Sequence, residues 1–505
     1  MPEKKSVVKN YMYNLIYQIL ILVLPLITTP YLSRVLGAEG VGIYSYTYAI
    51  TTYFMLFGSL GISLYGQREI AYAQNNKIKR KRTFIELILF RFITIFIAML
   101  IYFIFFIKGQ TYQVYYSILL IEIIAAGFDI SWFFQGLEEF KKTVFRNVLV
   151  RTVSVSLVFI LVKTQSDLWK YMLIYSLADL FGNLLLWTYL PKYLKGKKIK
   201  HINIKRHIIP VLLLFVPQVA NKIYNLLDTT MIGAIISDKA ETGYYEQGQK
   251  VIRLLLTIVT SLGIVMVPRM ASTFAEGDKK KIRNYLQTSF SFVFIISVPL
   301  MFGIISVAKS FVPIFFGEGY DKVAVLIAIF SPMLILMGIE NVIGTQYLLP
   351  TKRQKEFTIS VVCGILTNIV LNAILITFFS SIGASIATVI SQLVVDCVQI
   401  YVVRKEIRFK PIIRNFVRYF FSGFVMFIVC LIVKLIISTN AFNGIILAIA
   451  SNSLSAVTVG HVISIALQVI VGGLTYFGML YILKDKYFYM IVNKISMKIL
   501  KRELI

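Results

Sequence analysis

Residues 11–36 read YMYNLIYQILILVLPLITTPYLSRVL, a long and mainly apolar run. A helix needs about 20 apolar residues to cross the hydrocarbon core of a bilayer, and this run is long enough. Lys4, Lys5 and Lys9 precede it. The run is longer than the apolar core of a cleavable signal, and no small-residue cleavage site follows it. It therefore predicts a first membrane-spanning helix and not a leader peptide.

Similar runs recur along nearly the whole chain of 505 residues, of which 58% are hydrophobic and 15% charged. Backbone polar groups in lipid must be bonded within their own segment, and continuous runs favour helices over the alternating strands of a barrel. We therefore predict an all-α integral membrane protein with about 14 transmembrane helices. The predicted spans are 12–36, 41–65, 84–107, 114–137, 144–163, 168–190, 208–233, 243–270, 284–307, 321–348, 357–379, 383–403, 415–437 and 461–483.

The basic residues test this count, because lysine and arginine concentrate in the cytoplasmic loops of membrane proteins. The net charge is +28. With the N-terminus inside, the basic clusters all fall on one side, at 80–82, 141–142, 195–200, 279–281, 352–355 and 404–418. The alternation supports an even number of helices and cytoplasmic termini. It also explains the charge without nucleic-acid binding.

Several classes of function are excluded by what the chain lacks. Its three cysteines lie in apolar runs without paired spacing, and its three histidines form no ligand cluster, so neither a disulfide framework nor a metal site is predicted. There is no phosphate-binding loop for ATP and no polar domain that could hold a soluble active site. We expect a transporter and not an enzyme.

A weak internal repeat predicts two halves. Ser59-Leu60-Gly61-Ile62 recurs as Ser261-Leu262-Gly263-Ile264, and Gly42 and Gly243 open the corresponding helices. An even number of helices per repeat gives parallel lobes related by an axis along the membrane normal. We predict an N-terminal lobe at 1–200 (helices 1–6) and a C-terminal lobe at 201–405 (helices 7–12) in a pseudo-two-fold arrangement. Helices 13 and 14 and a cytoplasmic tail would occupy 406–505.

Polar side chains concentrate in the spans 208–233 and 243–270, where they recur at three- and four-residue spacing. Ionisable groups are costly within lipid, so these stripes predict a functional site. Their cations, together with Arg34 in the first span, fit a cavity for an anionic group such as a pyrophosphate. The alternative is internal ion pairing, Lys222 with Asp228 or Arg253 with Glu246. The predicted substrate-binding residues are Arg34, Gln218, Asn221, Lys222, Asn225, Lys250 and Arg253.

Intramembrane carboxylates are candidates for ion coupling or gating. They are Glu122, Asp129, Asp228, Glu246 and Glu340. A structural alternative pairs Asp129 with Arg91. The sequence predicts no cofactor, and leaves H+ coupling, Na+ coupling and drive by the membrane potential open.

A series of short segments is spread over about residues 10–405. They include TPYLSRVLG at 29–37, FDISWFFQGLE at 128–138, DTTMIG at 228–233 and IGASIAT at 382–388. In their order and spacing these segments resemble polysaccharide repeat-unit flippases (Wzx-type, for O-antigen or capsule) of the multidrug/oligosaccharidyl-lipid/polysaccharide exporter superfamily. The resemblance implies a two-lobed bacterial plasma-membrane protein with a central cavity and alternating access. Its implied substrate is an undecaprenyl-pyrophosphate-linked oligosaccharide moved from the cytoplasmic to the outer leaflet, with a polymerase and other assembly proteins as partners. Gln392 stands where the family pattern has an acidic residue.

Other exporters of that superfamily are the alternatives. A flippase for a peptidoglycan precursor or a teichoic-acid-like polymer would share the predicted features. A multidrug antiporter would have about 12 helices and an acidic cavity, which the basic stripe argues against. A membrane-embedded polymerase would need an arginine-bearing outer loop, and none is visible.

Overall fold

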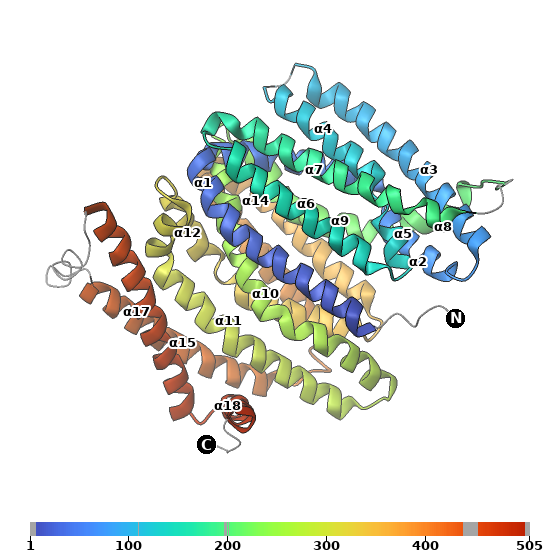
Figure 1. Ribbon diagram of the computed structural model, residues 1–505. Coiled ribbons are helices and arrows are strands. Elements are labelled where there is room, and N and C mark those ends of the chain that lie inside the picture. Colours follow the sequence, from blue (N-terminus) through green and yellow to red (C-terminus); the bar gives the residue numbers. More distant parts are fainter. Residues whose placement is uncertain (1–6, 110, 196–198, 200, 438–452, 500–505) are drawn as a thin grey trace. The chain divides into compact units, whose positions relative to one another are not determined.

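A computed structural model describes residues 7–109, 111–195, 199, 201–437 and 453–499 (Figure 1). Within these residues the secondary structure consists of helices and turns, with no strand. The predicted all-α class is therefore confirmed. The chain divides into two compact units, Met1–Gly243 and Tyr244–Ile505, which we call unit 1 and unit 2.

Unit 1 contains the first seven predicted spans, up to 208–233. Its elements are α1 (Val7–Ser59), α2 (Ile62–Tyr72), α3 (Lys77–Tyr102), η1 (Phe103–Ile107), α4 (Gln113–Phe128), α5 (Ser131–Gly136), α6 (Phe140–Leu161), η2 (Gln165–Asp167), α7 (Leu168–Tyr189), α8 (Pro191–Leu194) and α9 (Lys205–Ile235). Within it α7 packs between α4 and α6, and α1 packs against α3, α4, α6 and α9.

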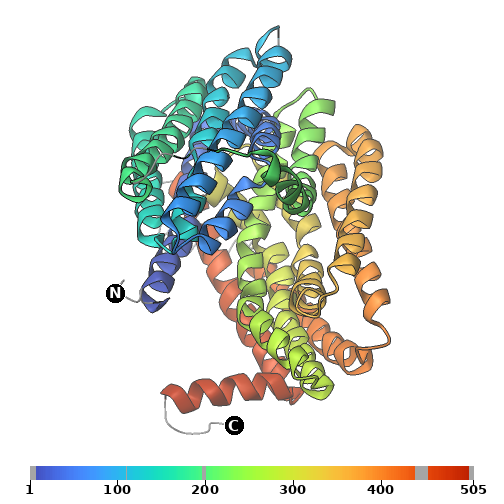
Figure 2. The ribbon, with the colours of Figure 1, turned by 90° about the vertical axis from the view of Figure 1, so that its right-hand side faces the viewer.

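Unit 2 begins within α10 (Ala240–Ala275). Its further elements are α11 (Lys279–Phe316), α12 (Asp321–Phe330), α13 (Met333–Glu340), η3 (Asn341–Leu348), α14 (Gln354–Val403), α15 (Phe409–Ile437), α17 (Ser453–Ile482) and α18 (Lys486–Ile499). The last two long helices, α15 and α17, pack on each other and on α11. Figure 2 shows α18 lying crosswise to them at their end.

The number of spans agrees with the prediction. Eleven described stretches are long and apolar enough to cross a membrane. Two of these, Val23–Tyr72 and Gln354–Val403, have 50 residues each, far beyond one bilayer thickness. Gly37 (φ 68°, ψ 175°) and Ser380 (φ 51°, ψ −129°) break them, so each supplies two spans. With α9, which has 31 residues, the described helices match the fourteen predicted spans.

The segment 128–138 is held by an aromatic core. Trp132, Phe133 and Phe134 of α5 are at most 1% exposed and pack with Phe84 of α3 and Tyr65 of α2. Trp132 stacks on Phe84 with 5.6 Å between ring centroids. Neighbouring polar residues of the same segment face elsewhere, so this core positions a polar face as well as supporting the fold.

Two glycines that the repeat placed at equivalent positions lie against each other in unit 1. A Cβ atom on Gly42 would lie 1.7 Å from the carbonyl oxygen of Lys239 and 3.0 Å from the amide nitrogen of Gly243. A Cβ atom on Gly243 would lie 2.1 Å from the carbonyl oxygen of Ala38. The start of α10 therefore packs on α1 at backbone contact, which only glycine permits at both positions.

Replacing Gly42 by alanine is expected to lower stability by about 1–3 kcal/mol or more, because the new methyl group overlaps rigid backbone. Gly478→Ala is the matched control, since a Cβ atom there would meet nothing within 4 Å. Thermal unfolding of the purified protein in detergent measures both changes. Equal unfolding temperatures for the two variants would contradict this close contact.

Two details differ from the repeat-based expectation. The first Ser-Leu-Gly-Ile copy ends α1, with Gly61 in the left-handed region (φ 70°) before α2, whereas the second copy lies inside the continuous helix α10. The boundary between the compact units also follows α9 instead of preceding it. The division into lobes at 1–200, 201–405 and 406–505 stays a prediction.

Candidate functional site

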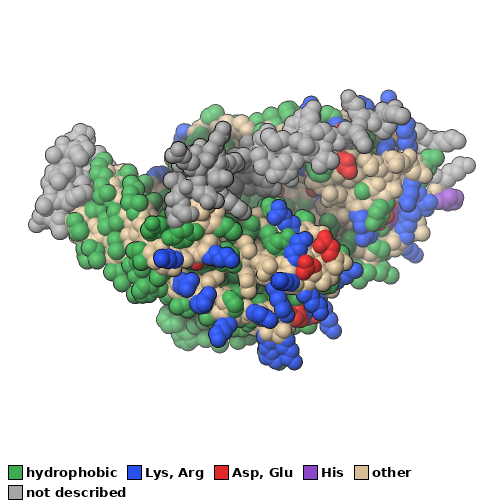
Figure 3. Space-filling view, turned by 90° about the horizontal axis from the view of Figure 1, so that it is seen from below, with side chains coloured by type: hydrophobic (Ala, Val, Ile, Leu, Met, Phe, Trp, Pro, Cys, Tyr) green, Lys and Arg blue, Asp and Glu red, His purple; other side chains and the backbone are tan. Residues whose placement is uncertain are grey.

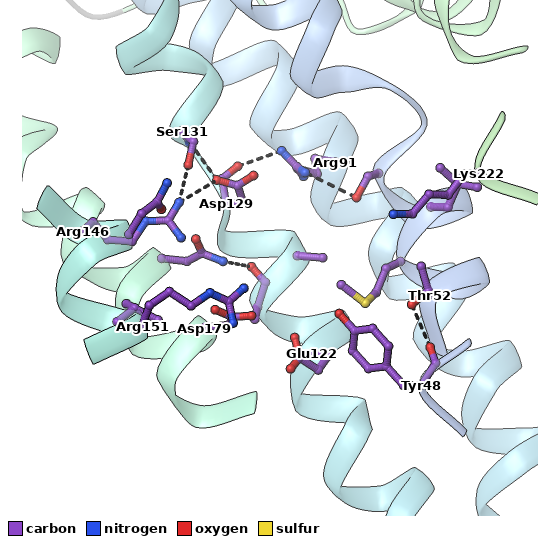
Figure 4. Close-up of a pocket in the computed structure, with 18 of the residues that line it drawn as sticks. Tyr48, Thr52, Arg91, Glu122, Asp129, Ser131, Arg146, Arg151, Asp179 and Lys222 are labelled. Atoms are coloured by element: carbon purple, nitrogen blue, oxygen red, sulfur yellow. Dashed lines mark hydrogen bonds and ion pairs between the residues drawn. The ribbon is translucent and has the colours of Figure 1, made fainter. Parts of the chain in front are cut away.

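A charged cavity of about 540 Å³ lies within unit 1 (Figure 4). Seven helices line it, and four of its residues are basic and three acidic. Its charged residues are Arg91, Arg146, Arg151, Lys222, Glu122, Asp129 and Asp179. Its other polar residues include Tyr48, Thr52, Ser59, Ser131, Gln135, Asn147 and Asn183. Such a set is incompatible with contact to lipid tails, so the cavity is a polar interior in an otherwise apolar bundle.

One wall is built by a break in the fourth span. The helix α4 stops at Phe128, and Asp129 takes an extended conformation before α5 begins at Ser131. The Asp129 carboxylate accepts a hydrogen bond from the Ser131 amide at 2.9 Å. Non-helical backbone is tolerated at membrane depth where it lines a cavity and its polar groups find partners. The aromatic core next to it fixes this break in place.

Arg91 bonds to the non-helical backbone between α4 and α5. Its side chain is 2% exposed, and it donates to the Asp129 carbonyl oxygen at 2.7 Å. Its other terminal nitrogen donates to the Ser59 and Ser63 hydroxyls at 3.3 and 3.4 Å. The hydrogen bonds of Arg91 thus go to the backbone of Asp129 and to two hydroxyls, whereas the Asp129 carboxylate lies near Arg146. Arg91 is a structural cation of the cavity.

The two arginines of α6 face the acidic side of the cavity. Arg146 donates to the Ser131 hydroxyl at 2.5 Å and lies 3.8 Å from an Asp129 carboxylate oxygen. Figure 4 shows Arg151 beside Asp179 of α7. Its guanidinium also lies 5.7 Å from the centre of the Tyr175 ring. The α6 cations are therefore balanced in part by carboxylates.

Lys222 differs from these three arginines. It projects from α9 into the cavity from the side opposite Arg146 (Figure 4). Lys222 is exposed. Among the described side chains, none forms a hydrogen bond or an ion pair with its ammonium group. An ammonium group with this placement is chemically suited to an anion, and the predicted role of Lys222 in substrate binding stays a prediction.

Tyr48 lines the cavity and begins a row of packed tyrosines, which we call the tyrosine wall. Tyr48 stacks on Tyr44 at 5.3 Å between centroids, and Tyr44 meets Tyr171 edge to face at 4.9 Å. Tyr171 in turn meets Tyr175 at 5.0 Å. Tyrosine combines an apolar ring face with a polar tip. A wall of this kind beside carboxylates suits a polar ligand with apolar faces, such as a sugar.

The structure brings some of the predicted site residues together and not others. Lys222, Glu122 and Asp129 line the unit 1 cavity. Arg34 is exposed and donates to the Pro30 carbonyl oxygen at 3.3 Å. Asp228 is 3% exposed, inside α9. The side chains of Gln218, Asn221 and Asn225 lie outside the described residues.

The remaining predicted residues belong to unit 2. Arg253 lies 3.9 Å from a Glu246 carboxylate oxygen and also donates to Gln249. Lys250 is half-buried one turn before Arg253, on the same helix. Glu340 ends α13. Roles for these residues in binding or coupling stay predictions.

Most of the cavity lining was not among the predicted site residues, including the two arginines of α6, Arg146 and Arg151. A signal was present, since both interrupt the apolar span 144–163 and intramembrane arginines mark functional sites. That span carries fewer polar residues than 208–233, and the site was predicted from the spans with the most polar residues.

Two family models each match more than half of the chain. The model described as "Polysaccharide biosynthesis protein" matches residues 7–274, which include every residue of the cavity. The model "Lipid II flippase MurJ" matches residues 195–455. The chain belongs to the polysaccharide biosynthesis protein family. Its predicted likeness to Wzx-type flippases of the multidrug/oligosaccharidyl-lipid/polysaccharide exporter superfamily is thereby confirmed.

Relatives and solved structures agree with family membership. The chain is 26% identical over 414 residues to the "Putative O-antigen transporter" of Escherichia coli (strain K12), covering 80% of this chain and 98% of the relative. A lipid II flippase MurJ in an inward closed conformation shares the fold, with a TM-score of 0.67, 15% identity and coverage of 94% and 98%. An inward-facing multidrug resistance MATE family transporter has a TM-score of 0.58 and 11% identity, over 76% and 94%. The family member described here is thus a multi-pass membrane protein whose relatives are transporters and flippases.

Proposed function

We propose that this chain flips an undecaprenyl-pyrophosphate-linked oligosaccharide repeat unit from the cytoplasmic to the outer leaflet of a bacterial plasma membrane, by alternating access. The product would feed the assembly of a surface polysaccharide such as capsule, O-antigen or exopolysaccharide. A polymerase and other assembly proteins would take over the flipped unit.

The observation that supports this proposal is the charged cavity of unit 1, in which Lys222 has no ion-pair partner among the described side chains. A lipid pyrophosphate needs cations at membrane depth, and arginine and lysine are the side chains that bind phosphate oxygens. The sugar would meet the tyrosine wall and the carboxylates Glu122 and Asp179. The lipid tail can stay in the bilayer, so only the polar headgroup must be housed.

The membrane potential would supply part of the proposed driving force, and this part needs no coupled ion. An inside-negative membrane potential favours outward movement of an anion by about 2.3 kcal/mol per charge per 100 mV. The cytoplasmic termini that the proposal requires follow from the distribution of basic loops. Coupling to H+ or Na+ through Glu122, Asp129, Asp228, Glu246 or Glu340 is the alternative source of energy.

Complementation tests the proposed function. In a bacterial strain that lacks its own O-antigen or capsule flippase, expression of this chain is expected to restore surface polysaccharide and to remove the accumulated lipid-linked repeat unit. Lipid extraction with mass spectrometry of the undecaprenyl pyrophosphate species measures the second effect. Continued accumulation of the repeat unit, with the protein present in the membrane and a native repeat unit supplied, would contradict the proposal.

Lipid II is a second candidate substrate, because the lipid II flippase model matches residues 195–455. Both substrates carry a polyprenyl pyrophosphate, so the cation Lys222 does not distinguish them. Rescue of growth after depletion of the endogenous lipid II flippase would favour this second substrate. Restored surface polysaccharide without such rescue would favour the first.

A further inference from the structure

A second basic cavity lies in unit 2, apart from the cavity described above. Its volume is about 440 Å³. The end of α10, the start of α11, η3 and the segments flanking α14 surround it. The lining residues are Phe274, Lys279, Ile282, Arg283, Leu286, Tyr347, Thr351, Arg353, Lys405 and Glu406.

The single acidic residue in this lining is already occupied. Arg353 donates through one terminal nitrogen to both Glu406 carboxylate oxygens, at 2.7 and 2.8 Å. The Tyr347 hydroxyl donates to the same carboxylate at 2.6 Å. Arg353 is also 3.0 Å from Glu356. Arg353 is therefore shared by two carboxylates, Glu406 and Glu356, and adds no uncompensated positive charge to the wall.

Three further cations line the cavity without such compensation. Lys279 and Arg283 lie one helical turn apart at the start of α11, which places them on the same side of the helix. Lys405 follows the end of α14. Among the described residues none forms a hydrogen bond or ion pair with these three side chains. Like charges repel one another, and a bound anion would relieve this repulsion.

Part of the lining is apolar. Ile282 and Leu286 of α11 are buried, and Phe274 of α10 is 42% exposed. The cavity lies where long apolar helices end, so in a bilayer it would lie near the membrane surface. Figure 3 looks onto a face of the molecule where Lys and Arg side chains gather beside hydrophobic ones. Basic pockets between membrane helices at this level suit anionic lipid headgroups.

We propose that this cavity binds a phosphate group, held by Lys279, Arg283 and Lys405, and that the group is supplied by the headgroup of an anionic phospholipid. The lipid tails would run along the apolar edge at Phe274 into the bilayer. This site is independent of the proposed transport function, because none of its residues lines the unit 1 cavity.

Binding of phosphatidylglycerol to the full-length protein tests the site. The protein is placed in nanodiscs of equal parts phosphatidylglycerol and phosphatidylcholine, released, and examined by native mass spectrometry for retained lipid. One basic side chain near an anionic headgroup contributes about fivefold in affinity, so Lys279→Gln, Arg283→Gln and Lys405→Gln combined should weaken retention by about a hundredfold.

The matched control combines Lys280→Gln, Arg408→Gln and Lys410→Gln. These residues are exposed cations of the neighbouring segments that do not line the cavity. The control makes the same change in net charge and should retain the lipid. A conservative combination of Lys279→Arg, Arg283→Lys and Lys405→Arg should retain it as well. Equal loss in the cavity and control variants, or undiminished retention in the cavity variant, would overturn the site.

A soluble arm distinguishes the two sources of phosphate. Sodium pyrophosphate is added to the protein in detergent, and the thermal unfolding temperature is measured. A stabilisation that is lost in the cavity variant and kept in the control, without lipid retention, would support the phosphate site and overturn the lipid as its source. Absence of both effects in the wild-type protein would overturn the site altogether.

Discussion

Replacing Lys222 by alanine is expected to reduce export of the lipid-linked precursor by at least about tenfold. A charge-assisted hydrogen bond to phosphate contributes about 1.5–3 kcal/mol, which corresponds to about 10- to 150-fold in binding. Lys222 has no carboxylate partner among the described side chains, so its removal leaves no buried acid unpaired. Loss of transport should therefore occur without loss of protein. The measurement is the ratio of accumulated repeat unit to surface polysaccharide in the complemented strain, alongside the protein level in the membrane.

Two control variants separate charge from position. Lys222→Arg keeps the cation and should retain a substantial part of the activity. Lys108→Ala removes an exposed cation of the same unit that lies outside the cavity, and should behave as the wild type. Normal export by Lys222→Ala at a normal protein level would refute the role of Lys222 as a substrate cation.

Arg253 gives a graded comparison. The sequence-based expectation treats Lys222 and Arg253 alike, since both are cations of the polar stripes. In the structure Arg253 already has Glu246 and Gln249 as partners within α10. Its net positive field is therefore weaker, and Arg253→Ala should reduce export less than Lys222→Ala does.

The helix count could be predicted because two independent signals constrain it. Hydrophobic length defines each span, and the basic loops must alternate in side. The breaks at Gly37 and Ser380 were also within reach, since the predicted spans 12–36 and 41–65, and 357–379 and 383–403, end and begin close to them. Glycine marks one break by its conformational freedom. Ser380 carries no comparable signal.

The cavity was harder to predict because a polar stripe along one helix does not identify the helices that it packs against. The spacing of polar residues shows that one face of a helix avoids lipid, yet it does not show which helix that face meets. Lys222 was found because its stripe is dense. Arg146 and Arg151 were passed over because their partners, Asp129 and Asp179, come from other helices. Their grouping is a property of packing, which the pattern along one helix cannot contain.

The segment 128–138 shows the same limit. Its resemblance to a family is a resemblance of sequence alone. In the structure its residues have two different roles. Trp132, Phe133 and Phe134 fill the aromatic core, while Asp129 and Gln135 line the cavity. A short motif can therefore be specific for a function although most of its side chains serve packing.

Glu86 of α3 is the residue whose replacement is expected to have the second large effect, a loss of stability. Its side chain is 0% exposed, and its carboxylate accepts from Arg82 at 3.0 Å, from the Asn203 amide at 2.8 Å, and from Arg206. The His207 Nε2 atom lies 3.0 Å away, and Nδ1 of the same ring is 2.9 Å from the Tyr65 hydroxyl. Glu86 thus ties Asn203 and the start of α9 to α3, and His207 links the same site to Tyr65 of α2.

Replacing Glu86 by alanine is expected to lower the free energy of unfolding by about 2–3 kcal/mol. Removing one partner of a buried ion pair costs about 3–5 kcal/mol, and the lower value applies because Arg82 and Arg206 remain 35% and 38% exposed. Glu86→Gln keeps part of the hydrogen bonding, so its free energy of unfolding should lie between those of the wild type and Glu86→Ala. Glu69→Ala breaks only the partly exposed pair with Arg68 and should change stability by less than about 0.5 kcal/mol. Thermal unfolding ranks the variants, and limited trypsin cleavage between Lys195 and Arg206 reports release of the connecting segment. If Glu86→Ala unfolds and is cleaved like Glu69→Ala, the carboxylate does not hold that segment.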